Sequence, residues 1–487
     1  MKKMWKSLFG ICVAVGLISQ SYAESAPTKQ QMMIEDCHVE GIRSQVRCGK
    51  LTVPENYNKP TDATLDVNFV VLPAHDNSKN NTPMMFLAGG PGQAAAQMAS
   101  GILRMFSEVR KTRDIILVDQ RGTGLSNGLQ CNNFEDYDLY EDITDDMSSQ
   151  DILDCLADFN VDLSHYNTTN AIRDFDALRD ALSIEKIALY GGSYGTRAAL
   201  VYMNMFPQHI ESVVLDSVGP VEIQIGLFGQ TGARSYQLLL ENCQLDEACH
   251  KAFPNLDEEF QALIERVEAE PIRATVMHPT LGSPTEFVIS RTKLISTLRL
   301  QLYFMQGRQF VPYVIHQAYL GNYLPLAGLV AQSGGDESGQ IHAGLLFNIL
   351  CSEDYPLVKQ NQWQADADNN FGRNEAQKNW HLACGVWPTY EVEREYFKPV
   401  TADIPTLIMS GKLDPVTPPS YGDIADKTLP NSRHIVVKNA SHIVVSSPCA
   451  IDLVNEFLTN KDPQAIDDTC LVEIEDERFI THVNGNN

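Results

Sequence analysis

Apolar runs alternate with helical stretches along the first half of the chain. Four of the runs are almost continuously apolar, as expected for strands covered on both faces, and the earliest alternates between apolar and polar positions. Together they predict strands at 65–74, 84–88, 114–119, 186–190 and 212–216. Residues 171–182 (AIRDFDALRDAL) repeat apolar positions every three or four residues, which predicts an amphipathic helix. The alternation of strand and helix predicts an α/β fold with a mostly parallel sheet.

The pattern changes after Pro220. Residues 221–400 show mainly helical periodicity, for example in LDEEFQALIERVEAE. Strand patterns return at 405–411 and 434–438. We therefore expect one α/β domain, made of residues 24–220 and 401–487, with a helical cap inserted before its last strands.

The first residues have the layout of a secretory signal. Lys2, Lys3 and Lys6 precede an apolar stretch that ends in small residues, and we expect cleavage after Ala23. No later segment approaches 18 uninterrupted apolar residues, so we expect no membrane association after cleavage and a periplasmic or secreted location. Loss of residues 1–23 would change the formal net charge from −25 to −28, because three lysines are removed. So acidic a chain disfavours nucleic acid as a partner.

Ten cysteines follow the predicted signal, and an even number in an exported chain suggests disulfides. The simplest arrangement joins sequential neighbours: 37 with 48, 131 with 155, 243 with 249, 351 with 384, and 449 with 470. No CxxC or His/Cys spacing suggests a metal site, and no motif implies a cofactor.

The strongest chemical motif is G-x-S-x-G at residues 191–195, centred on Ser193. It lies between a predicted strand and a predicted helix, which is the context of a nucleophile elbow. The alternative is a structural turn. The context favours a nucleophilic serine.

A serine nucleophile needs a base and an orienting acid, which follow it in the order acid, then histidine. Asp414 and His442 each come just after a predicted strand in that order. Asp216 also ends a strand and is the rival acid. His434 lies within its strand and His38 near the N-terminus, so we expect structural or surface roles for both.

An oxyanion hole should combine the backbone N–H of Tyr194 with one from the loop after an earlier strand. LAGGPGQ (87–93) supplies that loop, and we expect Gly90 to be the donor. The alternative is a tight turn without a catalytic role.

These motifs carry a family resemblance. LAGGPGQ, LVDQRGTGLS, GGSYGTR, SGKLDPVTP and ASH, in this order, resemble the exported α/β-hydrolases related to proline iminopeptidase and tripeptidyl aminopeptidase. The resemblance implies an α/β-hydrolase fold, a triad of Ser193, Asp414 and His442, and removal of residues from peptide N-termini. Ala88 stands where iminopeptidases often have histidine, which does not fit that subtype.

An exopeptidase must bind a free amino terminus, for which a carboxylate is the natural partner. Glu353 and Asp354 follow Cys351, and related enzymes carry an acidic residue after a cysteine here. We expect Glu353 to bind the amine, against the alternative of a solvated acidic turn. Asp119 and Arg121 are expected to brace the loops near the site.

The sequence thus predicts an exported serine aminopeptidase acting on peptides with a free N-terminus. An esterase or other small-molecule acyl hydrolase with the same triad is the alternative, because fold and nucleophile do not fix the acyl group. A non-catalytic binding protein with a hydrolase fold is a third hypothesis, which the ordered serine, acid and histidine disfavour.

Overall fold

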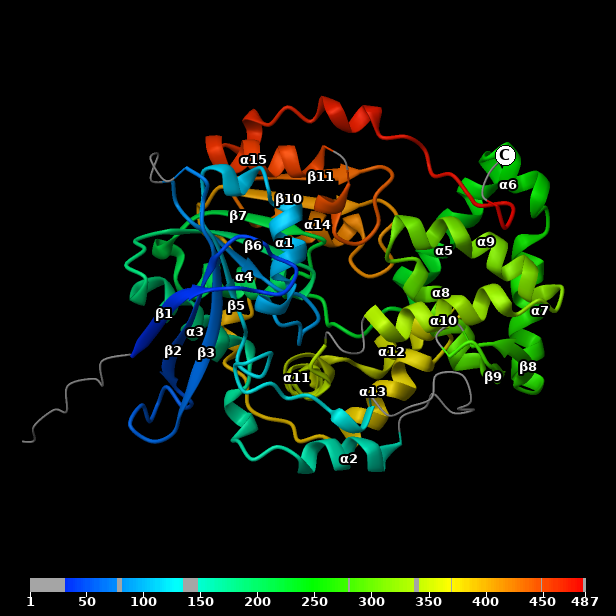
Figure 1. Ribbon diagram of the computed structural model, residues 1–487, viewed down its shortest axis with the longest axis horizontal. Coiled ribbons are helices and arrows are strands. Elements are labelled where there is room, and N and C mark those ends of the chain that lie inside the picture. Colours follow the sequence, from blue (N-terminus) through cyan, green and yellow to red (C-terminus); the bar gives the residue numbers. More distant parts are fainter. Residues whose placement is uncertain are drawn as a thin grey trace, which may run out of the picture.

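A nine-stranded sheet runs through the computed structural model, which describes residues 31–76, 81–134, 148–278, 281–336, 341–368, 370–447 and 449–484 (Figure 1). The predicted signal at 1–23 lies outside the described residues. The strand order is β1-β2-β3-β5-β4-β6-β7-β10-β11. The strands are β1 (Met32–Cys37), β2 (Val46–Pro54), β3 (Thr64–Leu72), β4 (Met84–Leu87), β5 (Ile115–Val118), β6 (Ile187–Gly192), β7 (Ile210–Asp216), β10 (Thr406–Gly411) and β11 (Ser432–Val437).

The sheet is parallel from β5 to β11 and antiparallel at its β1–β3 side. All seven predicted strands are confirmed as β3, β4, β5, β6, β7, β10 and β11. The sequence reading missed β1 and β2. β1 forms the exposed edge, so its side chains lack the apolar run that marks the central strands.

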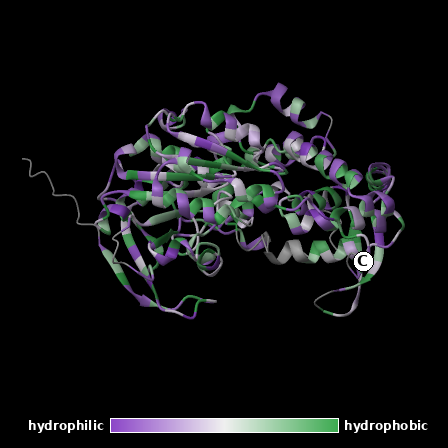
Figure 2. Cartoon of the chain, turned by 90° about the horizontal axis from the view of Figure 1, so that it is seen from above, coloured by the Kyte–Doolittle hydropathy of each residue, from purple (hydrophilic) through white to green (hydrophobic). Residues whose placement is uncertain are grey.

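Helices cover both faces of the sheet, and the central strands between them are mostly hydrophobic (Figure 2). α3 and α4 pack on one face, while α1 and α15 pack on the other. The core helices are α1 (Ala99–Met105), α2 (Ser149–Ala157), α3 (Thr168–Ala181), α4 (Tyr194–Met205), α14 (Pro419–Asp426) and α15 (Ala450–Asn460). The arrangement is that of an α/β-hydrolase fold.

The inserted region divides into two parts. Its helices are α5 (Gly229–Leu245), α6 (Glu247–Ala252), α7 (Leu256–Ala269), α8 (Arg291–Gln301), α9 (Met305–Tyr319), α10 (Leu324–Asp336), α11 (Ala343–Ile349), α12 (Gln360–Ala367) and α13 (Glu375–Val386). The part from α5 to α10, here called the cap, has its own apolar cluster and includes an antiparallel hairpin of β8 (Ile272–Met277) and β9 (Pro284–Ile289). Residues of α11 and α13, such as Phe347 and Ala383, instead join the cluster beneath the core sheet. The single helical insert predicted for 221–400 is therefore only partly a separate layer.

The chain end links the core to the cap. After α15, residues 471–480, here called the strap, cross from the core to the cap (Figure 1). Phe479 is buried in the apolar cluster of the cap. The buried carboxylate of Glu477 accepts a hydrogen bond from Arg308 Nε of α9 at 2.7 Å. The strap is thus anchored at its far end.

Five disulfides join the cysteines as predicted, between residues 37 and 48, 131 and 155, 243 and 249, 351 and 384, and 449 and 470. Among the described helices, none combines the length and hydropathy that a bilayer span requires.

Candidate active site

Ser193 stands in the sharp turn between β6 and α4. Its backbone has φ 55° and ψ −123°, a conformation that residues other than glycine seldom adopt. The turn needs glycine on both sides, because a Cβ at Gly195 would lie 2.0 Å from the Leu87 carbonyl oxygen and one at Gly191 would lie 2.4 Å from the Gly195 oxygen. The strained turn holds Ser193 beyond the end of the sheet, at the N-terminus of a helix.

The predicted oxyanion loop lies beside this serine. A Cβ placed on Gly89 would be 3.2 Å from the Cβ of Ser193. Gly90, Ser193 and Tyr194 line one small cavity. The Tyr194 amide belongs to the first turn of α4, where the helix dipole favours negative charge. The structure therefore brings the two predicted N–H donors and the serine together.

His442 and Asp414 meet at the same edge of the sheet, in the loops that follow β11 and β10. His442 Nδ1 lies 2.8 Å from Asp414 Oδ2. The other oxygen of Asp414 accepts from the amides of Val416, at 2.7 Å, and Thr417, at 2.8 Å. Burial opposes ionisation of Asp414, but the charge of His442 and these hydrogen bonds lower its pKa. An ionised Asp414 holds the Nδ1 proton and leaves Nε2 as the basic nitrogen.

Thr417 adds a contact that the sequence reading did not include. Its hydroxyl donates to Asp414 Oδ2 at 2.8 Å and lies 3.2 Å from His442 Nδ1. Thr417 follows Asp414 by three positions in LDPVT. This spacing is the sequence feature that could have indicated a contact between the two side chains.

The rival acid, Asp216, has a different place. One of its oxygens accepts from Val444 N at 2.7 Å, and the other accepts from Val445 N at 2.9 Å and Tyr190 OH at 2.7 Å. Burial raises its pKa despite these bonds. Asp216 therefore fixes the loop that follows His442, while Asp414 contacts the imidazole. His434 bonds to Asp423 and Ser410, and His38 is exposed.

The cap holds the same loops through both backbone carbonyls and side chains. The His442 amide donates to the Tyr303 carbonyl at 3.1 Å, and Ser441 Oγ donates to the Leu302 carbonyl at 2.5 Å. The Tyr303 ring meets the imidazole edge to face at 5.3 Å. Ser235 of α5 donates to the Leu413 carbonyl, next to the acid, at 2.6 Å. No sequence motif marks these contacts.

Glu353 does not lie on the cavity at Ser193. Both of its carboxylate oxygens accept from Thr168, one from the amide at 2.8 Å and one from the hydroxyl at 2.6 Å. Burial raises the pKa of Glu353 to about 7. Our expectation for Glu353 as a group facing the substrate therefore does not match this structure.

Asp354 points elsewhere, because successive residues of a helical turn project in different directions. Its Oδ1 lies 2.5 Å from Arg197 Nη1 and accepts from Ile225 N at 2.9 Å. Arg197 and Ile225 both line the cavity at Ser193. Within the described part of the chain, Asp354 Oδ2 is buried without a hydrogen-bond partner.

His342 is a further residue that the sequence reading missed. Its Nδ1 lies 3.0 Å from the Gly92 carbonyl oxygen, and its Nε2 accepts from Gly124 N at 2.9 Å. Burial lowers its pKa, in keeping with a neutral ring that donates at Nδ1 and accepts at Nε2. His342 therefore ties the oxyanion loop to the turn at Gly124. No motif surrounds it in the sequence.

The predicted bracing residues do hold neighbouring loops. Asp119 accepts from Ala96 N at 2.8 Å, just beyond the oxyanion loop. Arg121 is fully buried and donates to both oxygens of Asp174 in α3 at 2.7 Å.

Fold and site together define a serine hydrolase with an α/β-hydrolase fold. A family model described as "alpha/beta hydrolase fold" matches residues 82–242, and one described as "TAP-like protein" matches residues 369–470. These matches and the relatives below confirm the predicted resemblance to the α/β-hydrolases related to tripeptidyl aminopeptidase and proline iminopeptidase.

Three relatives illustrate the similarity. Tripeptidyl aminopeptidase of Streptomyces lividans is 23% identical over 474 residues, covering 90% of this chain and 86% of its own. Serine protease Hip1 of Mycobacterium tuberculosis (strain ATCC 25618 / H37Rv) is 23% identical over 437 residues, covering 80% and 82%. A putative proline iminopeptidase of Mycoplasma genitalium is 30% identical over 136 residues, covering 28% and 32%.

Proposed function

We propose that the protein is an exported serine aminopeptidase that cleaves peptides from a free N-terminus. The observation that carries the proposal is a buried carboxylate, Asp354, bonded to Arg197 and Ile225, which both line the cavity that contains Ser193. Relatives named as a tripeptidyl aminopeptidase and a serine protease support peptide substrates. The disulfides support an oxidising location, either periplasmic or secreted.

The reaction proceeds through an acyl-enzyme. His442 Nε2 takes the proton of the Ser193 hydroxyl as the oxygen attacks the scissile carbonyl. The amides of Gly90 and Tyr194 bind the developing oxyanion. His442 then protonates the leaving amine, and the C–N bond breaks. A water molecule, deprotonated by the same imidazole, hydrolyses the ester and regenerates the serine.

Asp354 is better placed than Glu353 to hold the substrate's amino group. One oxygen of Asp354 is bound by Arg197, and the other has no partner among the described residues. An ammonium group entering the cavity beside Ile225 would supply that partner through a charge-assisted hydrogen bond. Glu353 instead has both of its oxygens occupied by Thr168, at the start of α3.

Peptide anilides with a free amine, their N-acetylated counterparts and short-chain esters test the proposal. We expect the free amines to have the highest kcat/KM, and clear preference for acetylated peptides or esters would contradict it. Asp354→Asn should lower the preference for the free amine by about tenfold or more, because the charge-assisted bond is weakened. Glu353→Gln is the matched control, since it removes a neighbouring carboxylate charge that faces Thr168.

Labelling of the folded protein by a fluorophosphonate addresses the non-catalytic alternative. We expect Ser193 to be modified and Ser193→Ala to abolish labelling. Absence of labelling in the intact protein would favour a binding role.

A further inference from the structure

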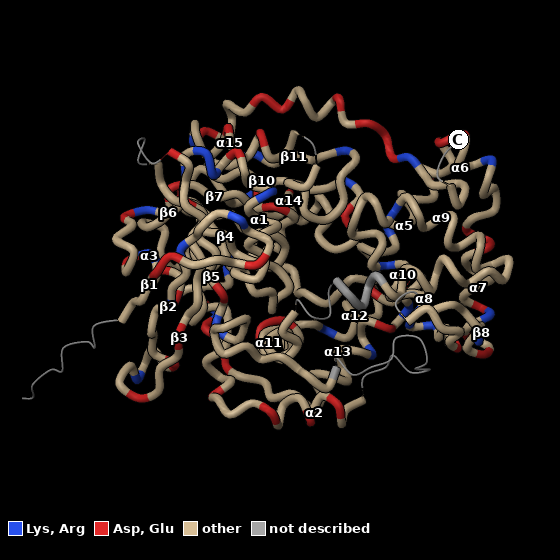
Figure 3. Tube along the Cα trace, viewed as in Figure 1, with Lys and Arg blue, Asp and Glu red and all other residues tan. Residues whose placement is uncertain are grey.

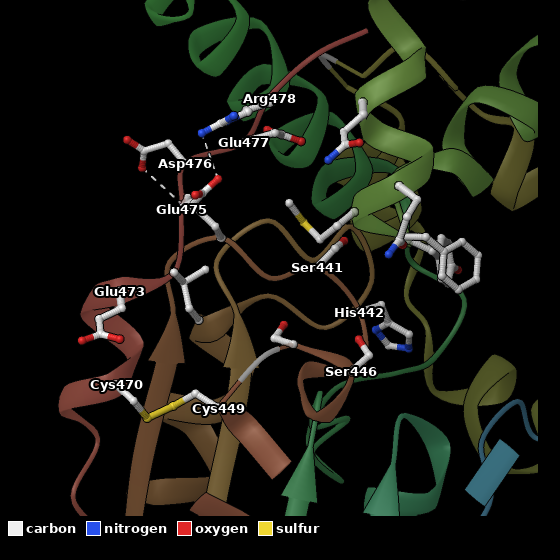
Figure 4. Close-up of a pocket in the computed structure, with 18 of the residues that line it drawn as sticks. Ser441, His442, Ser446, Cys449, Cys470, Glu473, Glu475, Asp476, Glu477 and Arg478 are labelled. Carbon is white, nitrogen blue, oxygen red and sulfur yellow. Dashed lines mark hydrogen bonds and ion pairs between the residues drawn. A yellow bond between two sulfur atoms is a disulfide. The ribbon is translucent and has the colours of Figure 1, made fainter. Parts of the chain in front are cut away.

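A groove of about 750 Å³ lies between the strap, the N-terminus of α9 and the loop that contains His442. Its volume is in the range of known ligand sites. His442 lies across the groove from the strap residues Glu473 and Glu475 (Figure 4). Ser193, Gly90 and Tyr194 line a different cavity, so the two sides of the catalytic centre open into separate spaces.

The chemistry assigns these spaces to different parts of a substrate. The acyl group is held where Ser193 attacks and the oxyanion forms. The leaving amine must be within hydrogen-bond reach of the imidazole that protonates it. A peptide that continues from the leaving nitrogen therefore enters the space lined by His442.

The strap gives this space a negative wall. Glu473, Glu475 and Asp476 are exposed on it, and Asp452 is exposed at the start of α15. Figure 3 shows acidic positions recurring along the strap. Arg478 pairs with Glu475 at 3.0 Å and Lys438 pairs with Asp476 at 2.8 Å, whereas no described residue forms an ion pair with Glu473 or Asp452. Glu473 and Asp452 therefore leave unpaired negative charge along the groove.

The wall is fixed at both ends. The disulfide of Cys470 holds its start against the core, and Glu477 and Phe479 hold its end in the cap. Residues 471–476 therefore cross from the core to the cap in a defined position, because both ends of the segment are held.

We propose that this groove binds the part of the peptide on the leaving side of the scissile bond and prefers lysine or arginine there. The proposal rests on the proposed peptidase function. It adds a specificity for the leaving fragment, which is released when the acyl-enzyme forms. The acidic wall attracts the basic side chains, while His442 at the inner end fixes the position of the leaving nitrogen.

Three peptides test this preference. They share the N-terminal part that is released as the acyl group, and on the leaving side of the scissile bond they carry Lys-Lys, Ala-Ala or Glu-Glu amide. We expect kcat/KM to be about tenfold higher for Lys-Lys than for Glu-Glu at low ionic strength, with the difference falling as salt is added. A ratio near one in the wild-type protein would overturn the proposal.

In the variant E473Q/E475Q/D476N, the ratio of kcat/KM for the Lys-Lys peptide to that for the Glu-Glu peptide should fall close to one. Turnover of the anilide with the same N-terminal part should be unchanged. E247Q/E258Q/E265Q, on exposed cap helices, changes the net charge by the same amount and should keep the wild-type ratio. Loss of the ratio in both variants would indicate a long-range charge effect and contradict a groove. Failure to cleave any free-amine anilide would instead contradict the proposed function itself.

Discussion

The core presents the chemically active side chains, whereas the cap contacts the loops that carry two of them. Ser193, Asp414 and His442 follow the ends of β6, β10 and β11, which belong to the parallel part of the sheet. The cap contributes the carbonyls of Leu302 and Tyr303 and the hydroxyl of Ser235. The core thus supplies the reacting groups, while the cap supplies contacts that position their loops.

The two regions also differ in how they are held. The core has two apolar clusters on the faces of its sheet, and the cap has a separate one. The strap joins them through Glu477 and Phe479. This difference suggests that the catalytic step and the attachment of the cap can be disturbed independently.

Asp414 and Asp216 test whether the catalytic step in the core can be disturbed separately from stability. Asp414→Asn should lower kcat by about 10³- to 10⁴-fold, because the amide no longer holds the correct imidazole tautomer. Asp216→Asn should instead lower the free energy of unfolding by about 1–3 kcal/mol, because it weakens buried bonds to Val444 and Val445. Activity assays and denaturant unfolding distinguish them. The assignment fails if Asp216→Asn reduces kcat more than Asp414→Asn does.

The buried pair of Arg308 and Glu477 tests how the strap is attached to the cap. Arg308→Met should cost about 3–5 kcal/mol of unfolding free energy, because it leaves a buried carboxylate unpaired. Arg478→Met removes an exposed pair with Glu475 and should cost about 0–1 kcal/mol. Denaturant unfolding measures both. Equal effects of the two substitutions would contradict the role of the strap as an anchor.

His342 tests whether a residue outside the cap and the triad positions the oxyanion loop. His342→Phe should lower kcat by about 10- to 100-fold with a smaller change in KM, because Gly92 loses a partner and the amide of Gly90 becomes less well placed. His342→Gln, which can still offer an acceptor, should recover part of the loss. His316→Phe, on α9 of the cap, is the control and should leave kcat near the wild-type value. If KM alone changes, a positioning role is excluded.

Glu353 is tested through the pH dependence of stability. Its folded pKa of about 7 exceeds the ordinary 4.5, so the folded state binds the proton more tightly. The stabilisation is fully present below pH 4.5 and is lost as the pH rises towards 7, with a slope of at most about 1.4 kcal/mol per pH unit. Glu353→Gln should remove this slope. Unfolding at pH 4.5, 6 and 8 measures it, and an unchanged slope would contradict the assignment.

The sequence predicted the elements whose cause is local. The central strands are continuous apolar runs because they are buried on both faces, and the elbow at Ser193 needs nearby glycines for close packing. β1, at the sheet's edge, lacks such a signal, and β2 beside it has only isolated buried positions instead of a continuous apolar run. The order of Asp414 and His442 followed from the loops after two predicted strands.

The missed features depend on contacts between distant segments. His342 meets Gly92 across 250 positions, and its neighbours in the sequence give no sign of this. Glu353 and Asp354 are adjacent and chemically alike, so only the direction of each side chain separates their roles. The division of the insert likewise depends on which apolar cluster each helix joins.

The disulfide pattern has a consequence for biogenesis. Every bridge joins consecutive cysteines of the predicted exported chain, with separations between 6 and 33 residues. A polypeptide oxidised in the order in which it emerges from a translocon would acquire each native bond without first forming a wrong one. We therefore expect maturation to require a thiol oxidant and little help from a disulfide isomerase.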